Sequence, residues 1–94
     1  MKVKCADSFF KKLKGLMFLK KFDYILKISC NGVHTFFMRV NIDIVLTDKN
    51  NKILYIYRDV KPNRIIIPKK KVTFTYEMPQ FYSDNYKIGN IFKS

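Results

Sequence analysis

Short apolar segments with a period of two residues dominate the chain from residue 24 onwards. Apolar and polar side chains alternate over 24–30 and again over 72–77, where VTFTYE predicts a strand with one exposed face. Residues 42–47 form a compact apolar run, which is typical of a strand buried on both faces. Turn residues such as Asn31-Gly32 and Pro62-Asn63 separate these segments. The pattern predicts an all-β fold of about seven to eight short strands, an antiparallel sandwich or barrel.

The remaining elements follow from the same reasoning. Residues 2–5 alternate and predict a first short strand, and the apolar spacing of three and four from Phe9 to Met17 predicts one short N-terminal helix that ends near Gly15. Asn31-Gly32 predicts a tight hairpin between strands over 24–30 and 34–39. Further strands are expected over 53–57, 64–67 and 86–92, the last interrupted at Gly89. With 94 residues, we expect one domain over 1–94.

Lysine accounts for most of a large positive charge. The chain has 19 basic and 7 acidic residues, for a net charge of +12. Such an excess can attract nucleic acid or an anionic membrane surface. However, the only arginines are Arg39, Arg58 and Arg64, and the abundance of Lys, Ile and Asn resembles the residue usage of an AT-rich genome. We therefore favour a solvated lysine surface over nucleic-acid binding, which stays an alternative.

Cysteine usage and hydropathy point to the cytoplasm. Cys5 and Cys30 are too few for a disulfide scaffold, and we expect buried free thiols, with a single bridge as the alternative if the protein is exported. No apolar run is long enough to span a membrane, and no apolar segment follows the N-terminal lysines as a secretory signal would require.

A mixed stretch from Cys30 to Asp48 contains most of the residues with chemical potential. Cys30, His34 and Met38 are soft ligands that suit Cu(I). In a tight hairpin, however, Cys30 pairs with Val33 and lies on the opposite face from His34. A longer, irregular turn would instead place Cys30 and His34 on the same face. We therefore expect no metal or other cofactor, and we expect no Cys–His nucleophilic pair.

The charged residues of this stretch permit two interpretations. Arg39 is surrounded by apolar sequence, and a buried charge requires a partner. The favoured interpretation is an internal clasp that fixes strand register, with Arg39 paired to one of three carboxylates: Asp43, Asp48 or Glu77. The alternative is a binding pocket for a small anionic or sugar-like ligand, formed by His34, Thr35, Arg39 and Asp43.

Several motifs together resemble the domain of unknown function 192 family. The resemblance begins at KGLMF (14–18), is strongest at CNGVHTFFMR (30–39) followed by IDIVLTD (42–48), and continues through PNR (62–64) and YEMP (76–79). The chain departs from the family pattern at Asn41, at Gln80-Phe81 and at Asn90. The resemblance implies a compact β-sandwich of jelly-roll-like topology and no defined reaction. The family-motif residues are Gly15, Cys30, Met38, Asp48, Glu77 and Gly89.

These observations favour a small non-enzymatic binding or accessory domain. Its polar cluster would lie around His34, Arg39 and Asp43. The first alternative is a basic nucleic-acid-binding module. The second is a hydrolase-type enzyme that uses His34 with Cys30 or Asp43.

Overall fold

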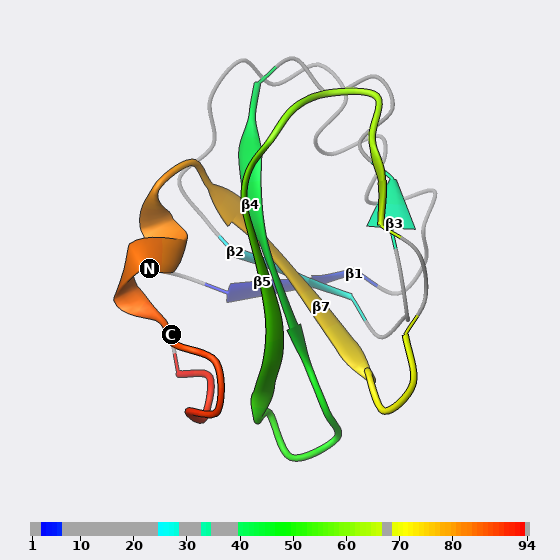
Figure 1. The fold of residues 1–94 in the computed structure, drawn as a ribbon, viewed down its shortest axis with the longest axis vertical. Helices are drawn as coiled ribbons and strands as arrows, with labels where there is room; N and C mark the ends of the chain where they lie inside the picture. Colours follow the sequence, from blue (N-terminus) through cyan, green and yellow to red (C-terminus); the bar gives the residue numbers. More distant parts are fainter. Residues whose placement is uncertain (1–2, 7–24, 29–32, 35–39, 67–68, 94) are drawn as a thin grey trace.

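A five-stranded sheet forms the centre of the molecule (Figure 1). The computed structural model describes residues 3–6, 25–28, 33–34, 40–66 and 69–93. The strand order is β1-β2-β7-β4-β5, and a second sheet pairs β3 with β6. The bounds are β1 Val3–Ala6, β2 Ile25–Ile28, β3 Val33–His34, β4 Ile42–Thr47, β5 Ile53–Val60, β6 Ile65–Ile66 and β7 Phe74–Pro79, followed by the 3-10 helix η1 Tyr82–Asn85.

The fold is mostly antiparallel β-structure, as the sequence pattern predicts. β7 pairs antiparallel with both β2 and β4, and β4 pairs antiparallel with β5. One pairing differs from the prediction, because β1 and β2 run parallel. The predicted N-terminal helix lies outside the described residues. None of the described residues forms a helix that is long and apolar enough to cross a membrane.

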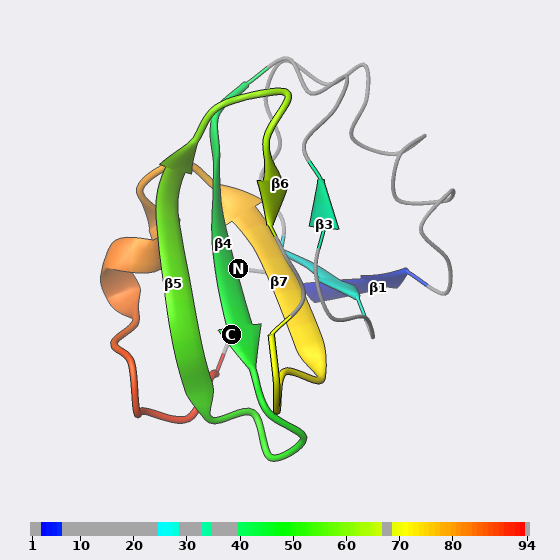
Figure 2. The same ribbon diagram turned by 45° about the vertical axis from the view of Figure 1, so that its right-hand side comes forward.

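Each face of the central sheet covers its own apolar cluster. Ile44 and Leu46 of β4 pack with Leu26 and with Ile66 of β6, so the small sheet closes this inner face (Figure 2). Val45, between them in sequence, points to the outer face, because successive side chains of a strand alternate. There it packs with Tyr76, Met78, Tyr86 and Phe92. β4 is buried along its whole length, as predicted.

Three predictions about strands are wrong. β7 is not half-exposed: it lies between β2 and β4 with both faces covered, so Thr75 and Glu77 are buried. β2 and β3 do not form a hairpin, because β2 is paired on both sides by β1 and β7 while β3 pairs with β6. The segment 86–92 is not a strand, since it makes only an isolated bridge between Ile91 and Lys52.

Candidate functional site

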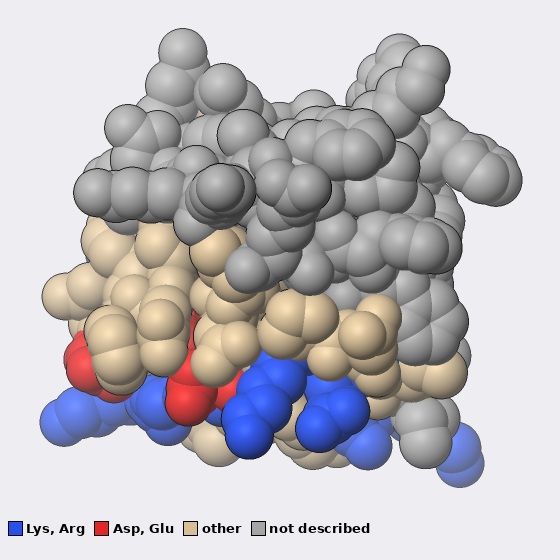
Figure 3. All heavy atoms as spheres, turned by 90° about the horizontal axis from the view of Figure 1, so that it is seen from above, with Lys and Arg blue, Asp and Glu red and all other residues tan. Residues whose placement is uncertain are grey.

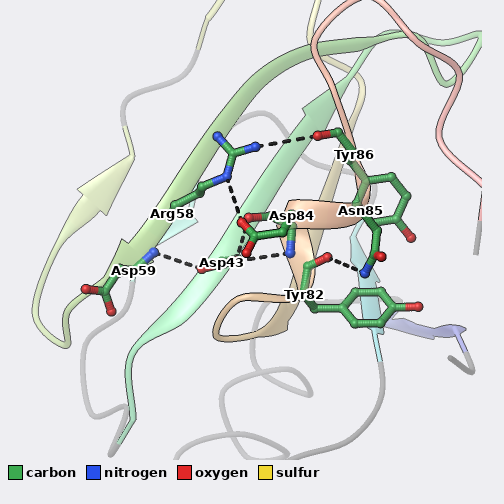
Figure 4. A network of polar contacts seen from close by, with 8 residues as sticks. Asp43, Arg58, Asp59, Tyr82, Asp84, Asn85 and Tyr86 are labelled. Carbon is green, nitrogen blue, oxygen red and sulfur yellow. Dashed lines mark hydrogen bonds and ion pairs between the residues drawn. The ribbon is translucent and has the colours of Figure 1, made fainter.

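Asp43 lies at the centre of a buried polar cluster (Figure 4). Its side chain is 1% exposed and projects from β4 toward η1. Oδ1 accepts the backbone N–H of Asp59 at 2.8 Å, and Oδ2 accepts both the backbone N–H of Ser83 at 3.1 Å and the Ser83 hydroxyl. Hydrogen bonds to the ionised form compensate the carboxylate for the water that it loses on burial. Asp43 therefore joins β4, β5 and η1.

A β-bulge in β5 creates the partner for Asp43. The register shifts between the pairs Ile42–Val60 and Ile44–Tyr57, so that two residues, Arg58 and Asp59, oppose the single residue Asp43. Asp59 takes a left-handed conformation with φ of 55°. Its Oδ1 accepts hydrogen bonds from Asn41 at 2.8 Å and Gln80 at 2.6 Å. The bulge thus exposes the Asp59 backbone N–H to Asp43.

The bulge also directs Arg58 toward η1. Its Nε lies 3.5 Å from Asp84 Oδ1, and its Nη2 donates to the Tyr86 carbonyl at 3.5 Å (Figure 4). Both side chains of the ion pair are at least half exposed, so water screens it and its contribution to stability is small. The partners of the Asp43 carboxylate are the Asp59 backbone and Ser83, which sequence reasoning missed. The predicted clasp with Arg39 stays a prediction.

The two buried carboxylates lie on opposite faces of the sheet. Asp43 is paired with Met78 and shares the outer face with it, whereas Glu77 is paired with Ile44 and Leu26 on the inner face. Both side chains are 1% exposed. Asp43 and Glu77 therefore belong to different layers and cannot line one pocket. Arg39, the predicted partner, lies outside the described residues, so its pairing stays a prediction.

Two family-motif residues shape turns at one end of the sheet. Asp48 Oδ1 accepts the backbone N–H groups of Asn50 at 2.8 Å and Lys52 at 2.9 Å, which holds the β4–β5 turn. Gly89 has φ of +93°, and its backbone N–H donates to the Ile53 carbonyl at 2.8 Å. Asp48 and Gly89 are therefore structural residues of this end.

The other predicted site residues are only partly placed. The backbone of His34 pairs with Ile65 in the small sheet. Thr35 lies outside the described residues, as do Gly15, Cys30 and Met38, so the ligand and metal alternatives at these positions stay predictions. Because β2 and β3 are in different sheets, the argument from a tight hairpin that Cys30 and His34 lie on opposite faces no longer applies. Among the residues that the structure describes, no three His, Cys, Asp or Glu side chains gather as a metal site would require.

The end of the sheet that Asp48 and Gly89 shape is rich in lysine. The β4–β5 turn, the loop before β7 and the C-terminal segment come together here (Figure 1), held by hydrogen bonds from Thr73 N–H to the Thr47 carbonyl at 2.8 Å and from Phe92 N–H to the Asn51 carbonyl at 2.7 Å. We call this surface the basic end, and its lysines are Lys49, Lys52, Lys69, Lys70, Lys71, Lys87 and Lys93. Among described residues of these segments, Asp48 is the only carboxylate, and backbone N–H groups engage it.

An aromatic stack holds the C-terminal segment against this end. The Phe92 ring lies 3.8 Å from the Tyr76 ring and 4.7 Å from the Tyr86 ring, measured between centroids. Burial, with the neighbouring hydroxyls of Tyr82 and Tyr76, raises the pKa of Tyr86 to about 12. The Tyr86 hydroxyl donates to the Lys93 carbonyl at 2.9 Å. Lys87 and Lys93 therefore belong to a segment that the core positions.

Tyrosine side chains of β5 border the basic end. Tyr55 is 38% exposed, and its ring is stacked beside that of Tyr57 at 6.5 Å between centroids and 22° between planes. Lys69 Nζ lies 5.5 Å from the Tyr55 ring centroid. Seen from above, described Lys and Arg side chains show along one margin, with acidic side chains among them (Figure 3). The sequence order did not reveal that Lys69 adjoins Tyr55.

Comparison with known proteins identifies the family. The model of the domain of unknown function 192 family, described as "Uncharacterized ACR", matches residues 1–90. The chain belongs to this family. A relative of this domain of unknown function 192 protein is a UPF0127 protein of Pyrococcus horikoshii. The two sequences are 34% identical over 91 residues, which cover 90% of this chain and 78% of the relative. A UPF0127 protein of Thermococcus sibiricus is 32% identical over 95% of this chain and 63% of its own length.

Solved structures share the fold of this family member. A protein of unknown function from Novosphingobium aromaticivorans superposes with a TM-score of 0.75 at 12% identity, over 88% of this chain and 66% of that protein. A protein from Sinorhizobium meliloti, described as a candidate transcription regulator, superposes with a TM-score of 0.78 at 14% identity, over 93% of this chain and 76% of that protein. At these identities the likeness shows the fold alone. The chain spans just under two thirds of the Novosphingobium protein.

Proposed function

We propose that this protein is a non-enzymatic binding domain whose ligand is nucleic acid, held at the basic end. The observation that carries the proposal is the gathering of lysines from three separate chain segments onto one surface. Among the described residues, hydrogen bonds and the Phe92 stack bring lysines that are distant in the sequence to the same end of the sheet. Adjacent ammonium groups attract a phosphate backbone and release its condensed counterions.

The Asp43 cluster has a structural role in this proposal. A catalytic carboxylate must reach the substrate, but Asp43 is 1% exposed and accepts three hydrogen bonds from Asp59 and Ser83. The proposal therefore assigns Asp43 to the scaffold and recognition to the lysines. The small-ligand site predicted from His34, Thr35, Arg39 and Asp43 stays a separate prediction, although the Asp43 carboxylate is already bonded to Asp59 and Ser83. The description of the Sinorhizobium protein as a candidate regulator agrees with nucleic-acid binding, but the proposal rests on this chain's own residues.

Salt-dependent binding of a labelled oligonucleotide tests the proposal. Fluorescence anisotropy would give the affinity of the wild type and of Lys49→Gln/Lys70→Gln across a series of salt concentrations. Both lysines are exposed, so the substitutions leave the core intact. We expect weaker binding and a log–log salt slope that is shallower by about 1.4, because each lost contact with a single strand removes about 0.7 from the slope.

A matched variant separates the basic end from net charge. Lys61→Gln/Arg64→Gln removes the same two charges from exposed positions in the loop at the other end of β5. We expect this variant to bind nearly as the wild type does. Equal weakening of both variants would show that only net charge matters and would contradict the proposal. Binding to anionic lipid vesicles without binding to oligonucleotides would contradict it as well, and would favour a membrane surface as the partner.

A further inference from the structure

The strand β5 presents an aromatic side chain where the basic end meets the edge of the sheet. Tyr55 lies on the outermost strand of the five-stranded sheet. Its cross-strand neighbour Leu46 is fully buried, yet Tyr55 itself is 38% exposed. A large ring at the rim of the core, with part of its surface open to solvent, can receive another planar group without any rearrangement of the core.

Two neighbours make this ring suitable for a nucleobase. Tyr57 follows at two residues along the strand, so both rings leave the same face, and their planes differ by only 22°. The Lys69 ammonium group lies over the Tyr55 ring, 5.5 Å from its centroid, in a cation–π contact. A ring that stacks on a base and a cation that meets the adjacent phosphate are the two components by which single-stranded nucleic acid is bound without sequence preference.

We propose that Tyr55 is a base-stacking residue and that the basic end thereby prefers single-stranded over double-stranded nucleic acid. The inference rests on the proposed function and names its ligand class. In a duplex the base faces are stacked on one another and unavailable to a protein ring, so a duplex can use only the lysines. A single strand can use both the lysines and Tyr55, and the difference in affinity between the two forms measures the stacking contribution.

Two substitutions at one position test the role of the ring. Tyr55→Leu keeps an apolar side chain over Leu46 but removes the aromatic face, and Tyr55→Phe keeps the face and removes only the hydroxyl. The probes are a fluorescein-labelled oligothymidylate strand and the same strand annealed to oligoadenylate. We expect Tyr55→Leu to weaken single-strand binding about 10-fold, because one base stack contributes roughly this factor. Duplex binding should stay unchanged, and Tyr55→Phe should retain single-strand affinity.

Quenching of the intrinsic tyrosine fluorescence gives a second measurement, which reports on contact with the ring and not on charge. The chain has 6 tyrosines and no tryptophan, so its emission comes from tyrosine. We expect the single strand to quench wild-type and Tyr55→Phe emission differently, since only the wild type retains the Tyr55 phenol, and we expect the duplex to quench neither appreciably. Thermal unfolding confirms that each variant is folded.

The outcomes distinguish this inference from the proposed function. Equal weakening of single-strand and duplex binding by Tyr55→Leu, or no weakening of either, would overturn the stacking role while salt-dependent binding still supports the basic end. Loss of single-strand affinity in Tyr55→Phe to the same degree as in Tyr55→Leu would also overturn it, because the hydroxyl would then be the important group. Failure of the wild type to bind either probe would overturn both proposals.

Discussion

Asp43 accepts a hydrogen bond of 2.8 Å from the backbone N–H of Asp59, which lies in the β-bulge where the regular pairing of β5 with β4 is interrupted. The bulge leaves that N–H without a partner in the ladder, and the buried carboxylate supplies one. Through its second oxygen the same carboxylate fastens Ser83, so one side chain sets the positions of both β5 and η1.

Substitution of Asp43 should destabilise the fold strongly. Asp43→Ala leaves the N–H groups of Asp59 and Ser83 and the Ser83 hydroxyl buried without their acceptor, and we expect a loss of about 3 kcal/mol in the free energy of unfolding. Urea denaturation measures this loss. Asp84→Asn is the control, since Asp84 is exposed and its ion pair is screened, and its effect should stay within about 0.5 kcal/mol. An Asp43→Ala midpoint equal to that of the wild type would refute the stabilising role of the bonds from Asp43 to Asp59 and Ser83.

Gly89→Ala should destabilise the protein through the backbone alone. A Cβ atom at this position would meet no atom within 4 Å, so no steric clash with neighbours arises. The φ of +93° is nevertheless unfavourable for an L-residue, and we expect a loss of about 1 kcal/mol. Thermal denaturation measures it. An unchanged melting temperature would show that the C-terminal segment readjusts freely.

Phe81→Gly should stabilise the protein, in contrast to Gly89→Ala. Phe81 precedes η1 with φ of 73°, and its side chain is 67% exposed, so it suffers the left-handed strain with little burial in return. Glycine removes the strain at the expense of a more flexible unfolded chain, and we expect a net gain of about 0.5 kcal/mol. Phe81→Ala keeps the Cβ atom and should give no such gain. If alanine stabilises as much as glycine, the ring and not the backbone is the source.

Tyr86 should make stability fall at alkaline pH. Its pKa is about 12 in the folded protein, against 10.0 for an unperturbed tyrosine, so above pH 10 the unfolded chain releases this proton more readily than the folded chain. Stability from this group is complete below pH 10 and declines as the pH rises from 10 to 12, by up to roughly 2 kcal/mol.

The variant Tyr86→Phe isolates this contribution. It removes the titrating hydroxyl and its bond to the Lys93 carbonyl, so it should be less stable at neutral pH by about 1 kcal/mol. Between pH 10 and 12 it should lose less stability than the wild type, because the lysines titrate equally in both proteins. Urea denaturation at several pH values gives the comparison, and parallel curves would argue against the raised pKa.

The alternation of side chains was sufficient to predict most of the described strands. Residues 42–47 read as a strand buried on both faces, and β4 occupies these residues at the centre of the packing. The same local pattern over 72–77 was misleading, because threonine and glutamate indicate an exposed face only when nothing covers them. Thr75 and Glu77 are buried because β7 lies between β2 and β4, a position that only the tertiary structure reveals.

The candidate site shows the same division between local and long-range information. The sequence by itself determined the family, the mainly β fold, the lysine excess and the unusual carboxylate within the buried run of β4. Only the tertiary structure decided that Asp43 is bonded to Ser83, which lies 40 residues away, and that Lys69 adjoins Tyr55. The physical reason is that a side-chain pattern defines which face a residue occupies, whereas its partner depends on which distant strand the folded chain brings to that face.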